Sequence, residues 1–236
     1  SLSLNDVADT LRNHSGVLST IRGATPPSRN GLSHANRIRD PNMAQALFWD
    51  VLSHIQTKHS NFGLGHKYSG LPRRFKRTIY AVDSTTIQLV ANCIDWAKHR
   101  RRKAAAKCHM QLNMQTFLPQ FAIVKAANTH DTTEAKELCA NLKDGEIALF
   151  DKAYVDFPHL NSLDDRRVFW VTRAKTNMSY QVVGQHREPK GNIRRDVLVE
   201  LTTEKSFNAY SKRLRLVEAD VEINGKMKTM IFITNN

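Results

Sequence analysis

The sequence has 236 residues, 41% of them hydrophobic, and a formal net charge of +13 at pH 7. This length and apolar content suit one sizeable globular domain, or one domain with a smaller module, and exclude a disordered chain. The charge predicts attraction to a polyanion, first of all nucleic acid, and no apolar run approaches the ~18 residues of a membrane-spanning helix.

Residues 1–62 are expected to form a helical N-terminal segment. Ser3 and Asp6 fit a capping box for the first helix, whose apolar face holds Leu4, Val7, Ala8 and Leu11. Asp40 and Pro41 mark the start of another helix, whose apolar stripe holds Leu47, Phe48, Val51, Leu52 and Ile55. Such a segment could bind DNA or could simply support the main domain, and the sequence leaves both open.

From residue 78 onward the pattern changes to strands. Strands are expected at residues 78–90, 107–115, 119–127, 146–151 and 167–172, with helices at 132–142 and 157–163. Three strands followed by alternating helices and strands predict an α/β fold with a mixed sheet and flanking helices, in the order of the ribonuclease H-like fold. Residues 176–234 are expected to be all-β, with a turn at Asn224 and Gly225.

Two aspartates follow apolar, strand-like runs: Asp83 after Thr78–Val82 and Asp151 after Ile147–Phe150. Carboxylates from two separate strands could share a divalent metal, which is the minimum for metal-assisted phosphodiester chemistry. Each could instead be an ordinary turn residue, since Asp is common where a strand ends. The element order favours the metal site, because the first and fourth strands of a ribonuclease H-like sheet are neighbours.

A run of basic residues lies between the first two predicted strands, close in sequence to Asp83. It could hold DNA phosphates or be a solvated hairpin loop, and it consists of Lys98, Arg100, Arg101, Arg102, Lys103 and, slightly beyond, Lys107. Lys152, directly after Asp151, could also contact phosphate or screen a carboxylate. The three cysteines, Cys93, Cys108 and Cys139, form no CxxC pair and predict free thiols in a reducing, cytoplasmic compartment.

Five blocks carry a family resemblance: Val82–Ile87, Lys107–Leu112, Thr129–Asp131, Phe150–Asp156 and Phe169–Lys175. In this order and spacing they resemble a bacterial insertion-sequence DDE transposase, of the group typified by insertion sequence four. The resemblance implies a ribonuclease H-like catalytic core whose first part is residues 78–175. It also implies a β-rich insertion at residues 176–236, and the sequence is expected to be truncated at both ends, before the last catalytic helix.

The resemblance implies two Mg²⁺ ions, replaceable by Mn²⁺, held by Asp, Asp and Glu. Asp83 matches the first position, where it is expected to bridge both ions, and Asp151 matches the second. The family's Glu lies on a helix after the insertion, and no residue here matches it; Glu200, Glu218 and Glu222 fall on predicted insertion strands.

The implied activity is metal-dependent phosphoryl transfer that cleaves transposon ends and joins them to target DNA. A homodimer on paired ends, acting at the bacterial nucleoid, is the implied assembly. Two alternatives stay open: a non-catalytic DNA-binding protein derived from a transposase, and a nuclease of the same fold.

Overall fold

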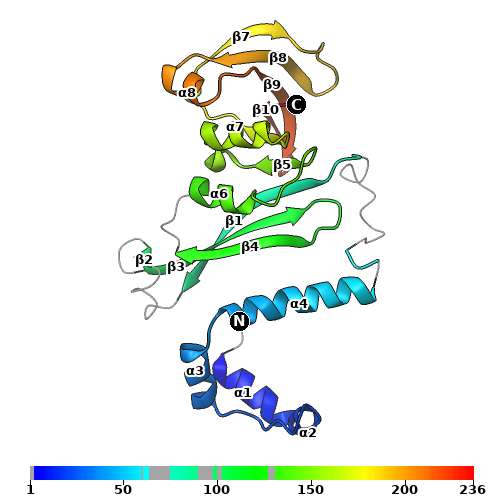
Figure 1. Cartoon of the computed structure of the whole chain (residues 1–236), viewed down its shortest axis with the longest axis vertical. Coiled ribbons are helices and arrows are strands. Elements are labelled where there is room, and N and C mark those ends of the chain that lie inside the picture. The colour runs from blue at the N-terminus through cyan, green and yellow to red at the C-terminus, as the bar shows by residue number, and fades with distance from the viewer. Residues whose placement is uncertain (1–2, 60, 64–74, 90–97, 100–102, 127–130) are drawn as a thin grey trace. The chain divides into compact units, whose positions relative to one another are not determined.

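A computed structural model describes residues 3–59, 61–63, 75–89, 98–99, 103–126 and 131–236 (Figure 1). The chain divides into two compact units, Ser1–Phe62 and Gly63–Asn236. In the described part of the chain no helix is both long and apolar enough to cross a bilayer.

The first unit is helical, as predicted. Its helices are α1 (Leu4–Asn13), α2 (Ser15–Ser19), α3 (Arg29–Ile38) and α4 (Asn42–Lys58). The capping box at Ser3 and Asp6 is present, and Ala8 is the residue of α1 that is buried. The apolar stripe of α4 remains exposed among the described residues, with 64% of Leu47 and 50% of Phe48 accessible.

The second unit is built on one sheet that contains all ten strands of the described residues, in the order β2-β3-β1-β5-β6-β10-β9-β8-β7, with β4 also pairing with β3. The strands are β1 (Ile79–Leu89), β2 (Lys98–His99), β3 (Lys103–Asn113), β4 (Pro119–Ala126), β5 (Ile147–Phe150), β6 (Phe169–Arg173), β7 (Tyr180–Gln185), β8 (Ile193–Leu201), β9 (Leu214–Ile223) and β10 (Lys226–Thr234).

The ribonuclease H-like prediction is confirmed by how these strands pair. Strand β3 pairs antiparallel with both β1 and β4, whereas β1, β5 and β6 run parallel to one another. The central order β4-β3-β1-β5-β6 therefore places the first and fourth strands of the predicted core side by side. Helix α6 (Asp131–Leu138) lies between β4 and β5 in the chain, and helix α7 (Phe157–Asp165) lies between β5 and β6.

The core lies between the sheet and these two helices. Leu138 and Cys139 from the α6 region and Leu160 and Leu163 from α7 are fully or almost fully buried. Trp170 of β6 is also inaccessible to solvent and makes an edge contact with Tyr210, with ring centroids 5.9 Å apart. It lies in the core because the parallel strands at the sheet centre are covered by helices.

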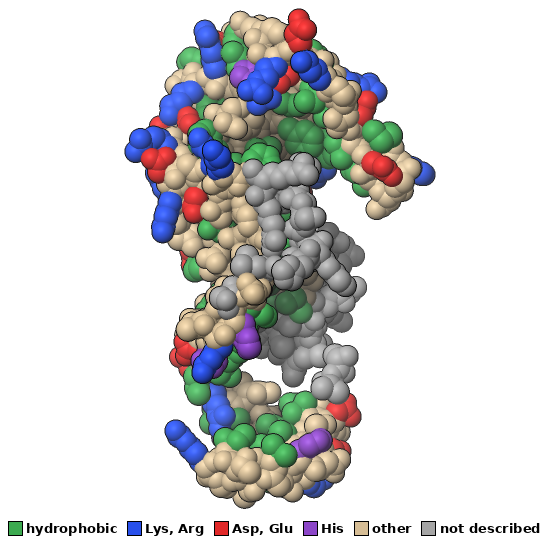
Figure 2. Space-filling model, turned by 90° about the vertical axis from the view of Figure 1, so that its right-hand side faces the viewer, with side chains coloured by type: hydrophobic (Ala, Val, Ile, Leu, Met, Phe, Trp, Pro, Cys, Tyr) green, Lys and Arg blue, Asp and Glu red, His purple; other side chains and the backbone are tan. Residues whose placement is uncertain are grey.

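The all-β expectation for residues 176–234 is wrong at one place. Residues Glu204–Ala209 form a short helix, α8, capped by Thr203, whose hydroxyl accepts a hydrogen bond from the Ser206 amide. Six residues are too few to produce a helical stripe in the sequence. Strand β10 then pairs antiparallel with β6, so this region continues the same sheet. On the face shown in Figure 2, Lys and Arg side chains are numerous over this region, with acidic side chains between them.

Candidate functional site

Asp83 lies where strand β1 loses one of its neighbours. The pairing of β1 with β5 ends at Val82 and Phe150, whereas its pairing with β3 continues to Leu89. Asp83 is therefore inside a strand but beside an open edge, and its side chain is exposed. One carboxylate oxygen accepts a hydrogen bond from the Ser84 amide at 2.7 Å.

Asp151 follows the last paired residue of β5 and caps a short 3₁₀ helix, η3 (Lys152–Tyr154). The Lys152 amide donates to Oδ1 of Asp151 at 2.7 Å, which repeats the local arrangement of Asp83. The guanidinium of Arg173 donates to the same Oδ1 from two nitrogens. Partial burial raises the pKa of Asp151, but the hydrogen bonds and charges of Arg173 and Lys152 outweigh it and hold the pKa below its usual value.

Three parallel strands bring these groups into one row. Val82 of β1 is paired with Phe150 of β5, and Phe150 is paired with Thr172 of β6. The next residues are Asp83, Asp151 and Arg173. Because neighbouring strands are about 5 Å apart, the two carboxylates and the guanidinium occupy adjacent positions on one edge of the sheet.

The two aspartates fit a hard divalent cation. In each of them Oδ1 accepts backbone or side-chain hydrogen bonds, while no hydrogen bond from a described residue reaches Oδ2. Carboxylate oxygens are the ligands that Mg²⁺ and Mn²⁺ favour. Within the described ranges no three His, Cys, Asp or Glu side chains are grouped to hold a metal. The described residues therefore offer two carboxylates at this position, and no third.

The glutamates of the predicted insertion strands cannot complete this set. Glu218 and Glu222 lie on β9, three strands away from β5, and Glu200 lies on β8, four strands away. At about 4.8 Å per strand these separations are about 14 and 19 Å, whereas two metals that share carboxylates are about 4 Å apart. Glu200 is instead paired with Arg213 at 2.9 Å.

The turn that carries Asp151 is anchored by the buried side chain of Tyr154. Tyr154, at the end of η3, is 1% exposed and its hydroxyl lies 3.3 Å from Nδ1 of His109 on β3. Its ring also packs against Phe150, with centroids 6.1 Å apart. Tyr154 is therefore a packing residue. His109 is an addition that the sequence did not indicate: the polar alternation in 107–115 is typical of a solvent-facing strand side, yet His109 and Gln111 are fully buried and Met110 is exposed.

The predicted DNA-binding residues are placed only in part. Lys98 pairs with Ala104 in the β2–β3 ladder, and Lys103 is in the same ladder, so the cluster spans a hairpin. Only the backbone of these two lysines is described, and Arg100, Arg101 and Arg102 lie outside the described residues. Lys107 is half-buried opposite Thr86, on the sheet face that does not carry Asp83. Lys152 is exposed directly beside Asp151.

Arg173 was missed as a site residue. It lies in the run Phe169–Lys175, one of the five blocks that carry the family resemblance. The available signal was its position: the residue after a parallel strand lies beside the residue after the neighbouring strand. Arg173 therefore lies beside Asp151, and its guanidinium donates to that carboxylate.

Comparison with known families decides the assignment. The family model described as a transposase DDE domain matches residues 74–219, a range that contains both Asp83 and Asp151. The chain belongs to the transposase DDE domain family. The finer assignment, to the group typified by insertion sequence four, stays a prediction.

Curated relatives of this family member are transposases by name. A putative transposase, y4zB, of Sinorhizobium fredii is 29% identical over 115 residues, which are 49% of this chain and 32% of the relative. A probable transposase for the insertion sequence element IS5377 of Geobacillus stearothermophilus is 26% identical over 105 residues, 44% of this chain and 27% of the relative. The matched part of the chain thus spans about a third of the length of these relatives.

Among solved structures, a piggyBac transposase synaptic complex with hairpin DNA matches 99% of this chain and 47% of that chain. The sequence identity is 13% and the TM-score is 0.43.

Proposed function

We propose that this transposase-family chain is the part of a DNA transposase that carries two ligands of its catalytic metals. The observation that carries the proposal is the placement of Asp83 and Asp151 at adjacent positions after paired residues of parallel β1 and β5. In a member of the transposase DDE domain family, such a pair supports metal-dependent phosphoryl transfer at transposon ends. The bacterial cytoplasm, at the nucleoid, is the proposed place of action.

The roles of the side chains follow from their positions. Asp83 and Asp151 would hold Mg²⁺ or Mn²⁺, and such ions, when bound, activate a nucleophilic oxygen and neutralise charge on the leaving oxygen. Arg173 fixes the orientation of the Asp151 carboxylate. Lys152, beside Asp151, would contact a DNA phosphate. Lys98, Arg100, Arg101, Arg102, Lys103 and Lys107 are proposed to hold the DNA backbone, with Lys107 the weakest member because it lies on the opposite sheet face.

A third carboxylate from outside the described residues belongs to the same proposal. The sheet face that carries Asp83 also carries exposed apolar side chains, among them Met110, Val124 and Ile87. Such a face suits a covering element, and an acid on that element would come close to Asp83. We include a glutamate there, and a homodimer on paired ends, as parts of the proposal.

Titration with Mn²⁺ by calorimetry tests the metal site. Asp83→Asn and Asp151→Asn are each expected to weaken Mn²⁺ binding by about tenfold or more, because each removes one charged oxygen ligand. The double variant is expected to show no saturable binding. Asp144→Asn is the matched control, because Asp144 is an exposed aspartate paired with Arg167 in a turn. Unchanged affinity in the double variant would refute the site.

A strand-transfer assay separates the transposase from a nuclease of the same fold. With labelled transposon-end DNA and a supercoiled target, the complete protein is expected to cleave and to join ends. Cleavage without joined product would favour the nuclease, and DNA binding without cleavage would favour a non-catalytic derivative. Residues 1–236 by themselves are expected to show little joining, because the proposal assigns them two of three ligands.

A further inference from the structure

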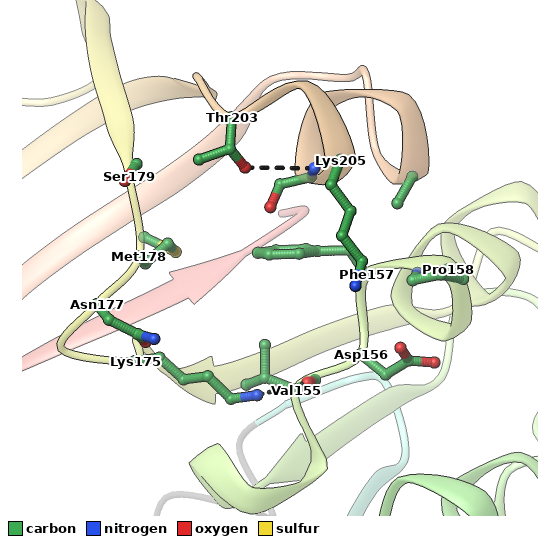
Figure 3. Close-up of a pocket in the computed structure, with 12 residues that line it drawn as sticks. Val155, Asp156, Phe157, Pro158, Lys175, Asn177, Met178, Ser179, Thr203 and Lys205 are labelled. Carbon is green, nitrogen blue, oxygen red and sulfur yellow. Dashed lines mark hydrogen bonds between the residues drawn. The ribbon is translucent and has the colours of Figure 1, made fainter.

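A pocket of about 440 Å³ lies in the second unit. Its walls come from the amino end of α7, the segment after β6 and the start of α8 (Figure 3). Phe157 crosses the middle of the pocket, and Met178 lies on the facing wall. A pocket of this size exceeds a single phosphate and suits a sugar–phosphate unit with an apolar wall for the sugar.

Two lysines give the pocket its charge. Lys175 and Lys205 come from different elements, and both side chains end near the segment Val155–Phe157. Lys175 donates one hydrogen bond to the Val155 carbonyl at 2.9 Å, which fixes its ammonium group and leaves two donors. No carboxylate within the described part of the chain forms an ion pair with Lys205. Asp156 is the one acid among the lining residues, so the lining carries a net positive charge.

Neutral groups in the walls favour the same kind of ligand. Asn177, Ser179, Thr203 and Ser206 supply amide and hydroxyl groups, which can donate to phosphate oxygens. The amino end of α7 also lies in the wall, and the Asp156 side chain makes no capping hydrogen bond there. The positive end of a helix dipole adds to the attraction for an anion.

The pocket is continuous in sequence with the strand ends of the metal site. Val155 ends the η3 turn that begins after Asp151, and Lys175 follows Arg173 by two residues. We propose that this pocket binds a backbone phosphate of the DNA substrate, held between Lys175 and Lys205. The proposal rests on the proposed function, since it names a contact of the same substrate.

The test measures the affinity of the chain for short duplex and single-stranded DNA at several salt concentrations, without divalent metal. The double variant Lys175→Gln with Lys205→Gln is expected to weaken binding roughly tenfold or more, because it removes charge-assisted hydrogen bonds. The slope of log affinity against log salt is expected to fall by about 0.7–0.9, the value for one phosphate contact. Lys205→Gln alone leaves the hydrogen bond from Lys175 to Val155 intact. It is expected to weaken DNA binding and to lower the salt slope, each by less than the double variant does.

The matched control is Lys226→Gln with Lys228→Gln, which makes the same charge change at the exposed start of β10. The proposal is overturned if both double variants change affinity and slope equally, or if neither does. It is also overturned if the pocket variant loses only the binding of inorganic phosphate or of a mononucleotide, which would make it a small-anion site. An absence of DNA binding by the unaltered chain refutes the proposed function as well. DNA binding that is unaffected by the pocket variant refutes only the pocket.

Discussion

Arg173 makes two of the hydrogen bonds that orient the Asp151 carboxylate. It donates from Nε at 3.0 Å and from a second nitrogen to Oδ1, and the Lys152 amide donates to the same oxygen. Three donors on one oxygen fix the plane of the carboxylate and leave Oδ2 for another ligand. The side chains of Arg173 and Asp151 are 38% and 43% exposed, so this ion pair is in contact with water and of modest energy.

Replacement of Arg173 should therefore separate metal binding from catalysis. Arg173→Ala removes a cation beside Asp151, so Mn²⁺ affinity is expected to rise by about two- to fivefold, the equivalent of an exposed ion pair. DNA cleavage by the complete protein is expected to fall, because the carboxylate loses its fixed orientation. Arg213→Ala, which removes an exposed arginine paired with Glu200, is the control for loss of charge. An unchanged Mn²⁺ affinity in Arg173→Ala would contradict this role.

At the level of the elements, a buried ion pair joins β8 and β9. Arg215 donates to both carboxylate oxygens of Asp196, from Nε at 2.8 Å and from a terminal nitrogen at 2.7 Å. The Asp196 side chain is 3% exposed. The hydrogen bonds from Arg215 lower the pKa of Asp196 and outweigh the opposing effect of burial. These strands connect β7 to β10, and β10 pairs with β6 of the same sheet.

Loss of Arg215 is expected to be costly because it leaves a buried charge without a partner. Arg215→Ala should lower the free energy of unfolding by about 3–5 kcal/mol. Arg194→Ala breaks a similar pair with Asp220 on the same two strands, but at an exposed position, and should cost at most about 1 kcal/mol. Urea unfolding followed by circular dichroism measures both. Equal losses of unfolding free energy in the two variants would show that burial does not determine how much an ion pair contributes to stability.

The elements also show what the sequence could and could not predict. Asp83 and Asp151 could be placed side by side, because each follows an apolar run and the order of elements specifies which strands are neighbours. The pairing of β10 with β6 joins Phe232 to Arg173 across about sixty residues, and no local pattern encodes a partner at that distance. Arg173 was missed for a related reason, since its role depends on which strand lies beside its own.

For the molecule as a whole, sensitivity to acid follows from its charges. The net charge of +13 grows as carboxylates are protonated, which increases self-repulsion. Burial raises the pKa of Asp164, but the ion pair with Lys212 and the hydrogen bonds from Asn235 and Tyr210 outweigh it and lower the pKa. Asp151 and Asp196 also have lowered pKa values. Their contribution to stability is complete above an unfolded pKa of about 3.9 and is lost as the pH falls through their folded values.

His159 is expected to make the protein lose stability already at milder acidity than the aspartates do. Burial lowers the pKa of His159 to about 4, with Asp156 opposing the shift and Lys136 and Arg166 adding to it. The folded state therefore favours the neutral ring, and its contribution is complete above the unfolded pKa of about 6.5. Between pH 6.5 and 4 the unfolded chain binds the proton first, so stability should fall by roughly 1.4 kcal/mol per pH unit.

Urea unfolding at pH 7 and at pH 4.5 isolates the effect of His159. The unaltered chain is expected to lose about 2–3 kcal/mol more than His159→Gln between these two values, since glutamine takes up no proton. His186→Gln, at an exposed position, should behave like the unaltered chain. Asp151, Asp164 and Asp196 have lowered pKa values and contribute little in this interval. A pH dependence that persists in His159→Gln would assign the loss to groups other than this buried ring.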